Sequence, residues 1–147
     1  MAVEITIQVE SKRWKTLLKP YTKTVQNACS AALSARKIKK GELAVVLAND
    51  AFVRDLNKTY RGKNKPTNVL SFPGQGDALG DIVLAHETIA REAREQGKRF
   101  KDHATHLLVH GVLHLSGLDH EADKEAEAME NMEVKILKKL DISNPYL

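Results

Sequence analysis

Cysteine, aromatic residues and long apolar runs are scarce in this chain, and each scarcity excludes a structural feature or a class of protein. Cys29 is the only cysteine, so no disulfide can form within the 147 residues, and its alanine neighbours on a predicted helix favour core packing. The single tryptophan, Trp14, is interpreted as a core residue or a surface lid, not as a platform for stacked bases. No apolar run approaches the ~20 residues that cross a bilayer, which excludes a transmembrane helix and a membrane partner.

Targeting and linker features are missing as well. Residues 1–14, MAVEITIQVESKRW, lack the positive region, apolar stretch and cleavage site of a secretory signal, so we expect a cytoplasmic protein. No repeat, low-complexity segment or linker interrupts the chain, and its length suits one hydrophobic core. The sequence therefore predicts a single domain over residues 1–147.

The charged residues are unevenly distributed. Residues 1–101 contain 19 Lys or Arg against 10 Asp or Glu, a balance of +9, whereas residues 102–147 contain 4 against 9, a balance of −5. The excess of basic residues over residues 1–101 suits binding to a polyanion such as nucleic acid, because contacts of Lys and Arg with phosphate supply most of the sequence-independent affinity for nucleic acid. A solvated basic surface explains the same balance. Residues 121–133 are interpreted as a solvated acidic helix face, with a contact to a basic protein as the alternative.

The spacing of apolar residues predicts an α+β fold. Four strands are expected, at residues 3–9, 43–48, 69–72 and 79–85. Helices are expected at residues 11–35, where Pro20 breaks or restarts the helix, and at residues 50–60, 88–96, 102–115 and 122–140. We therefore expect a small mixed four-stranded sheet packed with about five helices.

Three histidines stand close together in residues 110–120, HGVLHLSGLDH. His110 and His114 are four residues apart, so on a helix they share one face and aim at one point. Gly117 is expected to end that helix in a left-handed conformation and to turn the chain so that His120 becomes a third ligand. Three neutral imidazoles with an open position are typical of a catalytic zinc site. We therefore predict one zinc ion, or another divalent transition metal, on this C-terminal helix and turn.

The other histidines and Asp119 are expected to have supporting or structural roles. Asp119 is expected to hydrogen-bond a ligand imidazole, to cap the next helix, or to do both. His106 shares the helix face of His110 and is a weaker ligand candidate. His86 and His103 are expected to be surface or packing residues.

The histidine spacing also resembles that of the metzincin peptidases, with one decisive difference. Those enzymes carry a glutamate directly after the first histidine, where it serves as the general base. This chain has Gly111 there, and a glycine cannot accept a proton. The difference argues against peptide hydrolysis, and the segment offers no other evident general base.

A second segment is basic and rich in turn-forming residues. It comprises residues 60–73, YRGKNKPTNVLSFP, and is followed by residues 79–83, LGDIV. Together with the three-histidine segment, in this order and separation, it covers about half the chain and resembles the YbeY-type endoribonucleases, bacterial factors of ribosomal RNA maturation. Leu118 departs from the family pattern, in which many members have an aromatic residue; the change affects a pocket wall and not the ligands.

The resemblance implies a single α+β domain with a zinc or similar ion on His110, His114 and His120. It implies single-strand-specific cleavage of RNA in small-subunit rRNA maturation and ribosome quality control. The implied partners are RNA, chiefly rRNA, and the ribosomal small subunit or its assembly factors. The resemblance also implies a functional arginine, which falls on Arg61, so that Arg61 and His114 are the catalytic candidates.

The chemistry of the basic segment agrees with these implications. A guanidinium such as that of Arg61 can bind phosphate through two hydrogen bonds and stabilise charge that develops in a transition state. Lys63 and Lys65 either steer the RNA backbone or are plain solvated charges. Thr67 and Asn68 either shape the loop or hydrogen-bond RNA.

Two other functions stay open at this point. The first is a ribosome-associated, RNA-binding assembly factor in which the metal is mainly structural. The second is a metallohydrolase that acts on a peptide or a small phosphoester, against which Gly111 and the charge distribution argue.

Overall fold

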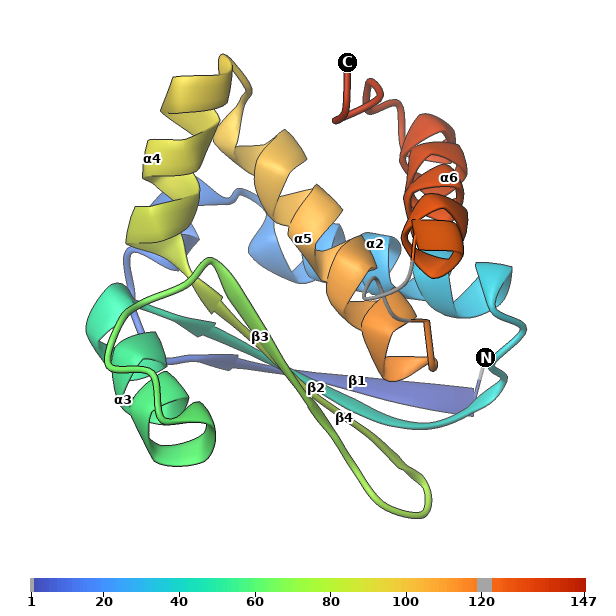
Figure 1. The fold of residues 1–147 in the computed structure, drawn as a ribbon, viewed down its shortest axis with the longest axis horizontal. Coiled ribbons are helices and arrows are strands. Elements are labelled where there is room, and N and C mark those ends of the chain that lie inside the picture. Colours follow the sequence, from blue (N-terminus) through green and yellow to red (C-terminus); the bar gives the residue numbers. More distant parts are fainter. Residues whose placement is uncertain (1, 119–122) are drawn as a thin grey trace.

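The computed structural model describes residues 2–118 and 123–147 and has an α+β fold built on one four-stranded sheet (Figure 1). The strands are β1 (Ala2–Val9), β2 (Lys40–Ala48), β3 (Val69–Pro73) and β4 (Ala78–Ala85). Strands β1 and β4 run parallel to β2 on either side of it, and β3 pairs antiparallel with β4, which gives the order β1-β2-β4-β3. The prediction of a mixed four-stranded sheet is confirmed.

The described residues form six helices. They are α1 (Trp14–Leu17), α2 (Tyr21–Ala35), α3 (Asp50–Arg61), α4 (His86–Gln96), α5 (Phe100–Leu115) and α6 (Asp123–Lys139). The expected number was about five; Pro20, at the N-cap of α2, divides the first helical stretch into α1 and α2, so that six are found. The expected start of the last helix at residue 122 lies outside the described residues.

The helices cover the two faces of the sheet unequally. Helices α2 and α5 pack on one face, and α6 packs against both of them from outside, whereas α3 covers part of the other face (Figure 1). Along β2 and β4, paired residues such as Val45 and Ile82 or Leu47 and Leu84 point into the main core, and alternate residues point to the α3 side. The sheet therefore supports α5 on one face and α3 on the other.

The single tryptophan and the single cysteine are both core residues. Trp14 has no exposed surface, and its indole N–H donates to the carbonyl oxygen of Ala48 at 2.7 Å. Cys29 is fully buried on α2. Among the described residues, none of the helices has the length and hydropathy needed to cross a bilayer.

Candidate active site

Helix α5 carries His110 and His114 and lies unusually close to the sheet beneath it. Gly111 permits this approach, because a Cβ at that position would lie 3.0–3.2 Å from three side-chain carbons of Ile82 on β4. Position 111 therefore faces the sheet. A glutamate there would be driven into the core and not toward a metal, which explains physically why this helix does not carry the metzincin arrangement.

Gly117 ends α5 as the sequence predicted. Its φ is +105°, its N–H donates to the carbonyl of His114 at 3.1 Å, and the N–H of Leu118 donates to the carbonyl of Leu113 at 3.2 Å. This pair of hydrogen bonds is a Schellman motif, which turns the chain sharply at a helix end. The predicted third ligand His120 and its neighbour Asp119 lie outside the described residues, so their roles stay predictions.

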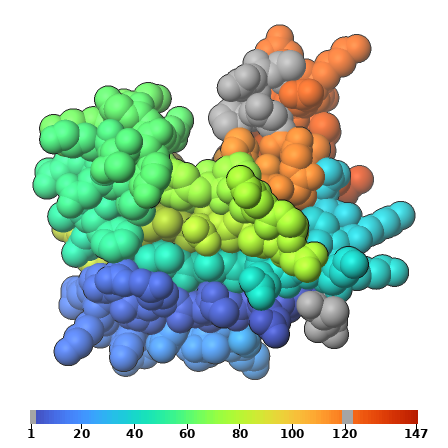
Figure 2. Space-filling model, turned by 90° about the horizontal axis from the view of Figure 1, so that it is seen from below, coloured from blue at the N-terminus to red at the C-terminus, as the bar shows by residue number. Residues whose placement is uncertain are grey.

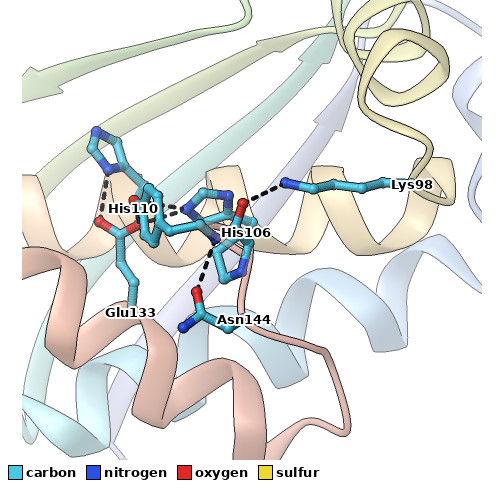
Figure 3. A network of polar contacts seen from close by, with 7 residues as sticks. Lys98, His106, His110, Glu133 and Asn144 are labelled. Atoms are coloured by element: carbon cyan, nitrogen blue, oxygen red, sulfur yellow. Dashed lines mark hydrogen bonds and ion pairs between the residues drawn. The ribbon is translucent and has the colours of Figure 1, made fainter.

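A buried carboxylate lies behind His110 (Figure 3). Glu133 on α6 has no exposed surface, and its Oε2 atom lies 3.0 Å from Nδ1 of His110. A carboxylate only accepts hydrogen bonds, so Nδ1 carries the proton and donates it. Nε2 is then the nitrogen with which His110 would bind a metal, and the carboxylate fixes both the tautomer and the ring orientation.

The second oxygen of Glu133 is also hydrogen-bonded. Its Oε1 atom lies 2.5 Å from Nε2 of His106 and accepts from the hydroxyl of Tyr146 at 2.6 Å. Burial acts to raise the pKa of Glu133, but the hydrogen bonds from His106, His110 and Tyr146 outweigh it and lower that pKa to about 2. Glu133 is therefore ionised at neutral pH although it is buried.

The interpretation of residues 121–133 as a solvated acidic face is wrong for Glu133. On helix α6, position 133 lies four residues after Met129 and three and four before Ile136 and Leu137, all of which are buried. Helical spacing thus placed Glu133 on the buried face, and this was the signal that could have identified it. Its partners could not be identified, because they come from α5 and from the segment after α6.

The remaining histidines have structural partners. His106, the weaker ligand candidate, directs Nε2 to Glu133. His103 is 5% exposed, and its Nε2 lies 2.9 Å from the carboxylate of Glu92, which confirms the prediction of a packing residue. The Nε2 atom of His86 lies 3.0 Å from the hydroxyl of Ser11.

The described residues fit a metal in part. Over residues 2–118 and 123–147, no three His, Cys, Asp or Glu side chains gather in a metal-binding group. His110 and His114 supply two imidazoles from one helix, and a catalytic zinc site usually takes three protein ligands. The carboxylate behind His110 is the partner that metal-binding histidines ordinarily have, so the donor chemistry suits a zinc-type ion.

Arg61 is the last residue of α3 and is exposed. Asn49 begins this helix by accepting the N–H of Phe52 at 2.9 Å, and Gly62 ends it with a φ of +67°. The neighbouring Tyr60 contacts Phe72 on β3 with ring centroids 5.5 Å apart. The position of Arg61 is therefore set by both ends of the helix and by a contact to the edge strand.

The basic loop after α3 is shaped by a residue that sequence reasoning missed. Asn57 is 2% exposed; its side-chain N–H donates to the backbone carbonyl of Lys65 at 2.9 Å, and its backbone carbonyl accepts the N–H of Lys63 at 3.2 Å. Both lysines are exposed. Asn68 donates to Glu92 at 2.9 Å, so its amide ties the loop to α4. Asn57 is one helical turn after buried Val53, which was the available signal.

Figure 2 shows a cleft between two parts of the molecule. One lobe, drawn in green, is α3 with the basic loop, and the facing orange lobe includes the end of α5; β3 and β4, in yellow-green, form the floor between them. In this view, α3 with the basic loop and the end of α5 thus stand on either side of the exposed strands.

Comparison with known proteins identifies the family. Residues 6–141 match the family model described as Endoribonuclease YbeY. Proteins of that name from Methylocella silvestris and Bartonella bacilliformis are each 46% identical to this chain; the alignments cover 97% and 98% of the chain and 85% and 97% of the relatives. The solution structure of TM1509 from Thermotoga maritima superposes with a TM-score of 0.67 at 28% identity, over 92% of this chain and 88% of that one. The chain therefore belongs to the YbeY endoribonuclease family.

Proposed function

We propose that this chain is a metal-dependent endoribonuclease that cleaves single-stranded RNA. The observation that carries the proposal is the contact between buried Glu133 and half-buried His110, with Oε2 and Nδ1 3.0 Å apart. An imidazole that is fixed by an ionised carboxylate on one nitrogen is prepared to bind a metal with the other. Membership of the YbeY family supports the nuclease activity, because its named relatives are endoribonucleases.

The metal is one zinc ion, or another divalent transition metal, on His110, His114 and His120. When bound, such an ion polarises a phosphodiester and lowers the pKa of a coordinated water toward ~7. Arg61 binds the phosphate across the cleft and stabilises the charge that develops on its oxygens. Lys63 and Lys65 attract the RNA backbone, and Asn68 keeps the loop in place through Glu92.

The substrate is chiefly rRNA, and the protein acts in small-subunit rRNA maturation and ribosome quality control in the cytoplasm. The ribosomal small subunit or its assembly factors are the expected partners. The charge distribution supports a polyanionic substrate, since residues 1–101 hold 19 Lys or Arg against 10 Asp or Glu.

A second candidate function is a ribosome-associated, RNA-binding assembly factor whose metal is mainly structural. It is favoured by the position of the Glu133 network between α5 and α6, where the loss of a bound metal would also weaken helix packing. The two candidates differ in the effect of His114→Ala. This variant should abolish cleavage at unchanged stability if the metal is catalytic, and should chiefly destabilise the fold if the metal is structural.

The proposal is tested by cleavage of a single-stranded rRNA fragment under single-turnover conditions. Arg61→Ala should lower the cleavage rate about 100-fold or more, as expected for the loss of a group that stabilises transition-state charge. Arg91→Ala on α4 removes another exposed arginine that is not part of the basic segment and should leave the rate unchanged. Equal rates for the two variants would contradict the assigned role of Arg61.

A further inference from the structure

The segment after α6, residues 140–147, turns back from the end of that helix toward the start of α5 (Figures 1 and 3). Lys98 donates from its Nζ atom to the carbonyl of Pro145 at 2.9 Å and anchors the segment to the end of α4. Asn144 accepts the N–H of Tyr146 at 2.8 Å, which fixes the backbone beside the tyrosine. The tyrosine hydroxyl then reaches Glu133.

We propose that Tyr146 is a positioning residue of the metal site: its hydroxyl, together with His106, holds the Glu133 carboxylate in the orientation that fixes His110. The inference rests on the metal site proposed above and adds a residue at least 26 positions away from its histidines in the sequence.

A glutamate side chain has several freely rotating bonds, so its carboxylate needs partners to hold one orientation. Each hydrogen bond to one of the oxygens of the Glu133 carboxylate narrows the orientations that it can take. Oε2 faces His110 at 3.0 Å, while Oε1 faces His106 at 2.5 Å and Tyr146 at 2.6 Å. Without the hydroxyl of Tyr146, Oε1 keeps one of these two partners, and the orientation of the carboxylate is less defined.

The geometry also sets the direction of each hydrogen bond. The carboxylate is acceptor only, so the Tyr146 hydroxyl must donate to it. The same hydroxyl lies 3.3 Å from Nε2 of His106, and the two rings meet edge to face with centroids 5.5 Å apart. Tyr146 therefore contacts both the carboxylate and its second imidazole partner, and it links the 140–147 segment to the group that orients the candidate ligand.

A purely structural role for Tyr146 gives a different expectation. In that case the tyrosine ties down residues 140–147, and its loss lowers the stability of the metal-free protein without altering metal binding. The test therefore needs metal affinity and the spectrum of a bound metal as readouts in addition to thermal stability.

The experiment titrates metal-stripped protein with Zn²⁺ against a chelator, and separately with Co²⁺ while its visible absorption is recorded. Tyr146→Phe removes only the hydroxyl, and Tyr21→Phe makes the same change on a half-buried tyrosine of α2. Tyr146→Phe should weaken Zn²⁺ binding about 10-fold, the lower end of what outer partners of a metal ligand contribute, and should shift the Co²⁺ bands. Lys98→Met should produce a smaller loss in the same direction.

The possible failures are distinguishable. If wild type binds Zn²⁺ but Tyr146→Phe binds it equally well with an unchanged Co²⁺ spectrum, the positioning role is wrong, whatever the melting temperature. If wild type itself binds no Zn²⁺, the metal site of the proposed function is wrong, and with it this inference. A similar loss of affinity in Tyr21→Phe would show a general effect and would also overturn the proposal.

Discussion

Replacing Gly111 by glutamate would give α5 the His-Glu sequence of the metzincin peptidases, and we expect it to destabilise the protein and not to create a peptidase. A Cβ at this position lies 3.0–3.2 Å from three carbons of Ile82, which is itself fully buried. The rest of the side chain must then enter the core. Overpacking costs about 1–3 kcal/mol, and burying an unpaired polar group costs roughly 2 kcal/mol or more. The expected loss of unfolding free energy is at least about 3 kcal/mol.

Gly111→Ala is the matched control. It adds only the Cβ, which requires Ile82 to shift by a few tenths of an ångström, and alanine favours a helix over glycine by about 1 kcal/mol, so we expect a much smaller loss than for Gly111→Glu. Urea unfolding of both metal-stripped variants, followed by circular dichroism, measures the difference. Wild-type stability for Gly111→Glu would refute the conclusion that position 111 faces the sheet.

Three further predictions concern buried groups outside the site. Burial raises the pKa of Cys29 to about 12, so the native thiol should resist alkylation at pH 8 and react rapidly once the protein is unfolded; rapid labelling of native protein would contradict this. Burial lowers the pKa of His103 below its ordinary 6.5 despite Glu92, so the unfolded state binds more protons and stability should fall as the pH drops below about 6.5. That part of the pH dependence should be absent in His103→Gln, and an identical pH profile would count against it. Trp14→Phe leaves the buried carbonyl of Ala48 without its donor and should cost about 2–3 kcal/mol in urea unfolding; an unchanged midpoint would show that the hydrogen bond is unimportant.

The fold could largely be predicted because its elements are marked locally. Strand β1 alternates apolar and polar residues, and Pro20 and Gly117 mark helix boundaries at the places where the structure has them. The count of helices differed only because a proline inside a helical pattern can bend a helix or divide it.

Of the candidate site, only the part that lies on α5 could be predicted from the sequence. His110 and His114 share a face of α5 by spacing alone, and the role of Gly117 follows from its lack of a side chain. Helical spacing could have placed Glu133 on the buried face of α6, but its partners and Tyr146 could not be identified, because the packing of α6 on α5 and the return of the 140–147 segment are tertiary contacts that no local pattern encodes. Asn57 was missed for a related reason, since its partner is a backbone carbonyl in the following loop.

The central claim is that a metal held by the histidines of α5 makes this chain an endoribonuclease. The most direct test is cleavage of a single-stranded rRNA fragment by purified protein in three states: metal-stripped, zinc-restored, and His114→Ala. We predict that cleavage is lost on stripping, returns with zinc and is absent in the variant, while the variant keeps its fold. Equal cleavage in all three preparations would contradict the account, because the activity would then come from a contaminating nuclease and not from this site.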